Sequence, residues 1–156
     1  ECTSNVLQEC SRDQLVNAYD NSIVETDHFL NSVIQWLEAK EGHADTAMVY
    51  VADHGESLGE NGIYLHGMPY SIAPDVQKHV PWVTWLSPSM QTRTGISTGC
   101  LQQNMRDKRI SHDSYFHSVL GLLDVQTGLH QLALDVYADC AAATSASASK
   151  KMPLPG

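Results

Sequence analysis

The sequence predicts an α/β fold, and three features carry that prediction. A long amphipathic pattern covers residues 11–40, short apolar segments follow at 46–52 and 82–86, and a second helical pattern begins near Ser111. Short segments that are apolar on both alternating faces are typical of strands covered by helices on both sides of a sheet. The order helix, strand, loop, strand, helix therefore indicates an α/β sandwich.

The first helix is expected over residues 11–40. Ser11 followed by Gln14 fits a capping box, in which the serine caps the open amides and the glutamine reaches back. Gly42, just past the last apolar residue, is expected to end the helix. Apolar side chains recur near one face at steps of three, four and seven: Leu15, Tyr19, Ile23, Leu30, Ile34 and Leu37.

Two strands are expected, over residues 46–52 and 82–86. The first is β-branched and apolar, and it ends abruptly at Asp53 and His54. Sheets of α/β proteins bind ligands beyond the carboxyl ends of their strands, so these two side chains are expected at such an edge. The tryptophans are expected in the core rather than in a substrate platform: Trp36, Trp82 and Trp85.

The remaining segments are expected to form a loop, two helices and a tail. Residues 56–81 are rich in glycine and proline and are expected to form a loop. Residues 101–108 fit a short polar helix, and the helix from Ser111 carries Tyr115, Val119, Leu122 and Leu123 on its apolar positions. The end, residues 141–156, is low in complexity and is expected to be a disordered tail or a remnant without a core.

Composition excludes several classes of function. The chain has 156 residues, with 18 acidic against 9 basic side chains and a formal charge of −9. Such a charge opposes sequence-independent nucleic-acid binding and docking on an anionic membrane. No apolar run approaches the roughly 18 residues of a spanning helix. With Glu1 first and no signal-type segment, the chain is expected to be a soluble, mature or excised piece.

The four cysteines are too widely spaced to form the close pair of a structural zinc site. An even number favours disulfides and an oxidising compartment, although four cysteines allow three pairings and four free thiols are the alternative. In one pairing, Cys2–Cys10 closes a short loop and Cys100–Cys140 joins two parts of the second half.

The tripeptide Asp53-His54-Gly55 is the sharpest chemical feature. Where the backbone curls after a strand, consecutive aspartate and histidine side chains can turn toward one point, and both are good ligands for Zn²⁺. Glu56 is a candidate for a supporting role, and His66 follows in the same glycine-rich stretch. The alternative is that Asp53 caps a turn and His54 is a solvated loop residue.

The remaining histidines are expected to be structural or solvated. His112 and His117 lie in the second predicted helix and are interpreted as a helix-terminus residue and a helical surface or packing residue. The others have no clustered partner in the sequence: His28, His43, His79 and His130.

The stretch YVADHGESLGENGIYLHGMPYSIAP, residues 50–74, closely resembles the lipid A phosphoethanolamine transferases of the mobile colistin resistance type. The resemblance continues through VQKHVPWVTWLSP and SHDSYFHSVLGLLDV, and upstream through NAYDNSIVETD. It covers residues 1–140, which are expected to be the carboxyl half of the periplasmic catalytic domain. It implies an alkaline phosphatase-like α/β/α sandwich of which only this half is present.

The resemblance also implies roles for named residues. Asp53 and His54 match two ligands of the main zinc ion, and His66 matches a histidine that contacts the substrate phosphate or a second metal. The other main-zinc ligands, a glutamate and the threonine nucleophile, are expected upstream of Glu1. Cys2–Cys10 matches a disulfide of the family, and Cys100–Cys140 is inferred for this branch.

The function implied is zinc-dependent transfer of phosphoethanolamine from phosphatidylethanolamine to a phosphate of lipid A, which gives polymyxin resistance. The complete enzyme is expected at the periplasmic face of the inner membrane, with an upstream half and a transmembrane region. The isolated chain is expected to be inactive or nearly so. The alternatives are a catalytically silent secreted fragment that binds metal, and a related phosphatase or sulfatase.

Overall fold

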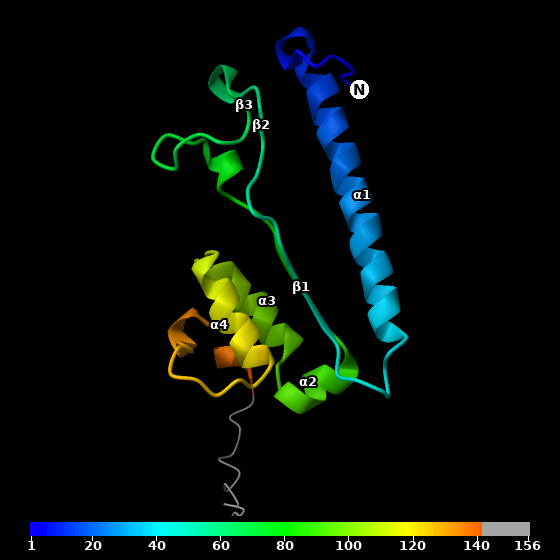
Figure 1. The fold of residues 1–156 in the computed structure, drawn as a ribbon, viewed down its shortest axis with the longest axis vertical. Coiled ribbons are helices and arrows are strands. Elements are labelled where there is room, and N and C mark those ends of the chain that lie inside the picture. The colour runs from blue at the N-terminus through cyan, green and yellow to red at the C-terminus, as the bar shows by residue number, and fades with distance from the viewer. Residues whose placement is uncertain (142–156) are drawn as a thin grey trace, which may run out of the picture. The chain divides into compact units, whose positions relative to one another are not determined.

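The computed structural model describes residues 1–141, which divide into two compact units, Glu1–Ser87 and the part that begins at Pro88 (Figure 1). The tail expected at 141–156 lies outside the described residues after Ala141. Among residues 1–141, no helix has both the length and the apolar character needed to cross a membrane. The helices and strands are α1 (Arg12–Glu38), β1 (Ala47–Val51), β2 (Ser57–Leu58), β3 (Tyr64–Leu65), β4 (Trp82–Leu86), α2 (Pro88–Thr94), α3 (Thr98–Asp107) and α4 (Asp113–Leu122).

Helix α1 begins as the sequence predicted. The Ser11 side chain accepts from the Gln14 amide, and the Gln14 side chain accepts from the Ser11 amide at 2.8 Å, which completes the capping box. The helix ends at Glu38, earlier than expected, and Ala39 is its C-cap. Gly42 lies in the turn that follows, at a φ of 83°.

The apolar face of α1 is only partly covered within the described chain. Leu15 is buried, whereas Ile23 is 50% exposed. Trp36 is 61% exposed, so its expected place in the core is wrong, and its ring instead lies 5.2 Å from the Lys40 ammonium. Helical periodicity identifies a face that can be buried, but burial itself needs another element to pack against that face.

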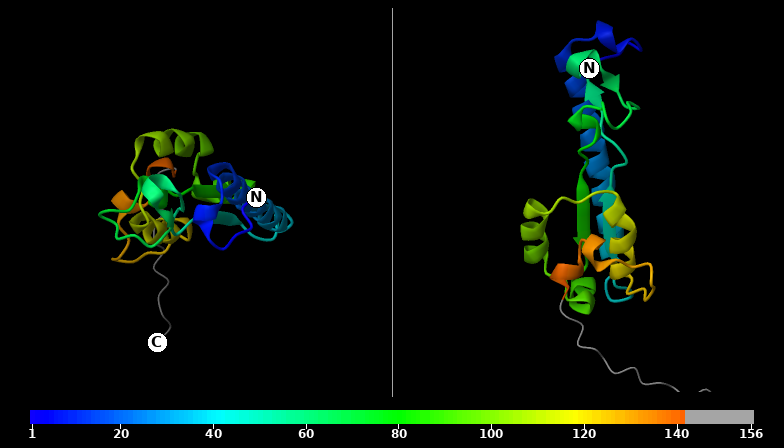
Figure 2. Two further views of the ribbon diagram at one scale, coloured as in Figure 1. Left: turned by 90° about the horizontal axis from the view of Figure 1, so that it is seen from above. Right: turned by 90° about the vertical axis from the view of Figure 1, so that its left-hand side faces the viewer.

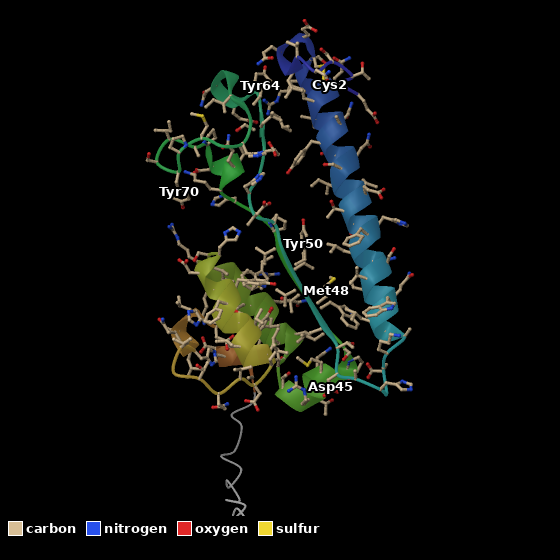
Figure 3. All side chains as sticks on the ribbon, in the orientation of Figure 1. Cys2, Asp45, Met48, Tyr50, Tyr64 and Tyr70 are labelled. Atoms are coloured by element: carbon tan, nitrogen blue, oxygen red, sulfur yellow. A yellow bond between two sulfur atoms is a disulfide. The ribbon has the colours of Figure 1, made fainter. Side chains whose placement is uncertain are left out.

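Strands β1 and β4 form a two-stranded antiparallel sheet beside α1 (Figures 1 and 2). Met48, labelled in Figure 3, is the buried residue of β1, and the other four residues of that strand are half-buried. The expected cover on both faces is therefore incomplete in these residues. Because the two strands run in opposite directions, only β1 directs its carboxyl end toward Asp53, and the rule drawn from parallel sheets applies to β1 alone.

The expected loop over residues 56–81 contains a short hairpin. Strands β2 and β3 pair antiparallel, with Ser57 opposite Leu65. Their connection turns at Gly59, whose φ of 108° suits glycine. Arg12 at the start of α1 reaches Glu60 in this connection at 3.5 Å, and the carboxylate of Glu60 accepts from the Leu58 amide at 2.7 Å.

The described part of the second unit contains the α-helices α2, α3 and α4. Ser97 caps α3, which extends the predicted polar helix toward its start, and α4 lies where the second helical pattern was expected. Helix α2 was not predicted, although Pro88 at its first position is a recognised start signal. The core of this unit comprises Met90, Ile96, Leu101, Leu122, Val136, Tyr137 and Cys140.

Both disulfides named in the sequence analysis are present. Cys2–Cys10 closes a loop before α1, and Cys100–Cys140 joins α3 to the segment that ends the described chain. No cysteine is free. Three pairings were open from the residue spacing, and the fold selects this one by bringing the Cα atoms of each pair to 5.6 Å.

His130 has a partner that its sequence neighbourhood did not reveal. Its Nε2 lies 3.0 Å from the buried carboxylate of Asp135, whose other oxygen accepts from the Tyr137 amide at 2.9 Å. The ring of His117, a buried residue of α4, lies 6.4 Å away and accepts from the Gln131 amide. The His117 contact therefore joins residue 131 to α4, and the His130–Asp135 contact closes the loop that follows.

We expect Gly121→Ala to destabilise the chain, although alanine is the better helix former. A Cβ at Gly121 would lie 2.0 Å from a carboxylate oxygen of Asp135, which its two hydrogen bonds hold in place. Thermal or urea unfolding should show a loss of about 2–3 kcal/mol, typical of a core clash. Gly99→Ala in α3, with its nearest atom at 3.8 Å, should instead be neutral or slightly stabilising. Equal stability of the two variants would contradict this prediction.

Candidate metal centre

Three side chains from two segments meet at the end of β1. His54 and Glu56 follow β1, and His66 follows β3. One ligand atom from each of the three lies within 4.8 Å of the others, and the described residues contain no other group of this kind. We call these residues the His54–Glu56–His66 cluster.

The hairpin register explains why Glu56 and His66 meet. Ser57 and Leu65 are the last pair of the antiparallel ladder, so the next residues outward, Glu56 and His66, begin close together, and their side chains meet at 2.7 Å. His54 lies two residues before Glu56, and its Nδ1 lies 3.9 Å from Glu56 Oε1. Reading residues 57–65 as a hairpin would have predicted this meeting from the sequence, whereas reading them as a loop did not.

The residues on either side of His66 both have left-handed backbone conformations. Leu65 has a φ of 61°, a left-handed conformation that costs a residue with a Cβ about 1–2 kcal/mol. Gly67 follows with a φ of 99°. The chain therefore turns sharply on both sides of His66, and the hairpin pairing of Leu65 offsets the local cost.

The contacts within the cluster are short. Glu56 Oε1 lies 2.7 Å from His66 Nδ1 and 3.9 Å from His54 Nδ1. The two imidazole rings are 3.8 Å apart between centroids and tilted by 32°. His54 Nδ1 also lies 3.2 Å from the carbonyl oxygen of Gly55. All three side chains are partly open to solvent.

Asp53 lies beside the cluster rather than within it. Its carboxylate accepts from the His54 amide at 3.1 Å, and its second oxygen lies 3.6 Å from His54 Nε2. The side chain is 90% exposed. Hydrogen bonds from the backbone amides of Asp53 and His54, with the nearby His54 ring, hold the pKa of Asp53 below its usual value. Asp53 is therefore ionised at neutral pH and adjacent to the two imidazoles.

The residues fit a cation. Glu56 Oε2 is buried and has no hydrogen-bond partner among the described residues. A buried carboxylate oxygen without a partner is costly, and a bound cation would remove that cost. Two histidines and one glutamate with an open position are also a common set of ligands in catalytic zinc sites.

Comparisons with known proteins place this chain in a family. The sulfatase family model matches residues 2–125.

The chain belongs to the sulfatase family. A phosphoethanolamine transferase, EptA of Salmonella typhimurium, is 46% identical over 139 residues, which are 89% of this chain and 25% of that protein. Phosphatidylethanolamine transferase Mcr-1 of Escherichia coli is 43% identical over 124 residues, covering 80% of this chain and 21% of that protein. The resemblance stated from residues 50–74 is thus confirmed, and the family is enzymatic.

A solved structure supports the fold. The soluble domain of lipooligosaccharide phosphoethanolamine transferase A from Neisseria meningitidis superposes with a TM-score of 0.85 at 42% identity, covering 90% of this chain and 42% of that domain. The alkaline phosphatase-like α/β class predicted from the sequence is therefore confirmed. This sulfatase-family chain spans about a quarter of the length of the Salmonella relative.

Proposed function

We propose that this chain contributes metal ligands and a phosphate-contacting histidine to the active site of a lipid A phosphoethanolamine transferase. The observation that carries the proposal is the convergence of His54, Glu56 and His66, in which the second carboxylate oxygen of Glu56 is buried without a partner among the described residues. The reaction class comes from the two relatives described above, which are named as phosphoethanolamine and phosphatidylethanolamine transferases and are each more than 40% identical to this chain.

The proposed metal is zinc, with Asp53 and His54 as the two ligands that the resemblance implies. The geometry adds Glu56 as a ligand, where the sequence indicated only a supporting role, because its Oε2 is buried without a partner among the described residues. Zinc bound there would supply a Lewis acid that polarises a phosphoryl oxygen. Glu56 accepts a hydrogen bond from His66 Nδ1, which orients the ring and leaves the lone pair on Nε2. His66 is half exposed and can therefore meet a phosphoryl group or a second metal ion.

Charge also favours a cationic centre. The chain carries a net charge of −9, and phosphatidylethanolamine and lipid A both present phosphate groups. An acidic protein needs local positive charge to receive anionic substrates. A metal ion at the cluster, with His66 beside it, would provide that charge.

We propose that the rest of the transferase is supplied from outside this chain. The expected nucleophilic threonine has no counterpart assigned in these residues, and the remaining metal ligand, a glutamate, is expected in the same upstream half. The donor would be phosphatidylethanolamine, the acceptor a lipid A phosphate, and the location the periplasmic face of the inner membrane. Modification of lipid A by the complete enzyme would then give polymyxin resistance.

A zinc measurement tests the metal centre. The purified chain should hold about one zinc ion by elemental analysis after dialysis, and the double variant His54→Ala, His66→Ala should lose it. A matched variant, His28→Ala, His43→Ala, removes two exposed histidines that do not belong to the cluster and should retain zinc. Equal zinc content in the two double variants would contradict the proposed centre.

A chimera tests the reaction. Residues 1–141 would replace the matching segment of Salmonella typhimurium EptA, and lipid A from cells that express the chimera would be analysed by mass spectrometry. Addition of phosphoethanolamine to lipid A is expected. A stable chimera that binds zinc but only hydrolyses phosphate or sulfate esters would favour the hydrolase alternative. One that does neither would favour the catalytically silent fragment.

A further inference from the structure

The bend at residues 53–56, called the turn below, carries His54 and Glu56 and is attached to a second segment of the first unit. The Gly55 amide donates to the carbonyl oxygen of Gln77 at 3.0 Å. A Cβ at Gly55 would lie 2.0 Å from the carbonyl oxygen of Val76, so the two backbones are in direct contact. The peptide groups of residues 76 and 77 therefore fix the position of the turn immediately before Glu56.

The side chain of Gln77 makes a second attachment, on the other side of Glu56. Its Nε2 donates to Ser57 Oγ at 2.8 Å. Both groups lie in the interior, since Gln77 is 6% exposed and Ser57 is 1% exposed. A hydrogen bond between two buried polar side chains is costly to break, because each group loses its partner and finds no water in exchange.

The segment that carries Gln77 is itself well held. Residues Asp75–Gln77 form a short 3-10 helix, in which the Gln77 amide donates to Pro74 at 3.0 Å. Lys78 pairs with Asp75 across this helix at 3.0 Å, and its ammonium also lies over the Tyr70 ring. These contacts hold in place the short helix that carries Gln77.

We propose that Gln77 is a positioning residue for the metal centre. Its carbonyl holds Gly55 and its side chain holds Ser57, so the one residue between them, Glu56, has its backbone fixed on both sides. Glu56 is the residue that contacts both imidazoles of the cluster. Gln77 touches neither metal nor substrate and acts through Glu56, and this role rests on the metal centre proposed above.

The test measures zinc affinity rather than activity. The purified 156-residue chain is titrated with Zn²⁺ against a chromophoric chelator. Gln77→Met keeps the approximate volume of the side chain but cannot donate, and Ser57→Ala removes the same hydrogen bond from the other end. Each should weaken zinc binding about tenfold, the lower end of the effects seen for groups that orient metal ligands. The double variant should be no weaker than either single one, because both changes remove one shared interaction.

Ser118→Ala is the matched control. Ser118 belongs to the second unit, is fully buried, and its Oγ accepts from the Val136 amide at 3.0 Å. Its loss should lower the melting temperature of the metal-free chain at least as much as Ser57→Ala does, yet leave zinc affinity within about twofold of the unmodified chain. This comparison separates positioning from general destabilisation.

The outcomes are distinguishable. Zinc affinity that is unchanged in Gln77→Met and Ser57→Ala, or reduced only as much as in Ser118→Ala, would overturn the positioning role while leaving the metal centre intact. Additive losses in the double variant would also overturn it, because the two side chains would then act separately. Zinc binding that survives His54→Ala, His66→Ala would overturn the metal centre and this role together.

Discussion

Gly55→Ala is expected to abolish zinc binding by the chain, with an affinity loss of at least about 100-fold, larger than the range for groups that only orient ligands. The new Cβ would lie 2.0 Å from the carbonyl oxygen of Val76 and 3.1 Å from its carbon. These are backbone atoms, so no side-chain rotation can relieve the contact. The turn must separate from residues 76 and 77, which breaks the bond from the Gly55 amide to Gln77 and moves Glu56.

The same variant should be less stable by about 2–4 kcal/mol, as expected for a clash that the backbone must absorb. Titration with Zn²⁺ and urea unfolding of the metal-free chain would measure the two effects. Gly128→Ala serves as the matched control, because no atom lies within 4 Å of its new Cβ. We expect that control to keep zinc affinity and to change stability by less than about 1 kcal/mol. Zinc affinity in Gly55→Ala equal to that of the control would show that the close approach to Val76 does not position the centre.

His66→Ala is expected to reduce phosphoethanolamine transfer by at least about 100-fold in the chimera with Salmonella typhimurium EptA. Loss of groups that merely orient metal ligands costs about 10–100-fold, and His66 is proposed to contact the transferred phosphoryl group or a second metal directly. Its removal also takes away the partner of Glu56 Oε1 and leaves that carboxylate with less to orient it. Mass spectrometry of lipid A and the polymyxin concentration that stops growth would measure the effect.

The control for this prediction is His28→Ala, an exposed change on α1. It should leave both lipid A modification and resistance at the level of the unmodified chimera. Immunoblotting would confirm equal amounts of the two proteins. Full lipid A modification by His66→Ala at an equal amount of protein would exclude His66 from the reaction and restrict the proposed site to Asp53, His54 and Glu56.

Local signals in the sequence were sufficient for much of the fold. The Ser11 capping box places the start of α1, because it depends only on residues three positions apart. The strand over 82–86 is present with the predicted bounds, since a short apolar run followed by Ser87-Pro88 leaves few alternatives. Helix α2 was missed because its seven residues give too short a pattern for periodicity to be recognised.

Burial was predicted less well than secondary structure. Trp36 and Ile23 satisfy the criteria for core residues in the sequence, yet both are exposed in the described chain. The chain covers 42% of the solved Neisseria domain, so we expect the remainder of such a domain to pack against these side chains in the complete protein. Periodicity predicts which side chains can be buried, whereas the presence of a packing partner decides whether they are.

The sequence by itself determined the family of this protein, the α/β class and the candidate residues Asp53, His54, Glu56 and His66, because these follow from residue identity and short-range order. Only the tertiary structure decided which of them meet. Pairing of Ser57 with Leu65 brings Glu56 to His66, and the contact of Gly55 with residues 76 and 77 fixes the turn that carries His54 and Glu56. Gly55 and Val76 are 21 positions apart in the sequence, and only folding brings them into contact. A local sequence pattern therefore cannot predict that contact. The Asp135 partner of His130 and the choice among three disulfide pairings were decided in the same way, by which segments the folded chain brings together.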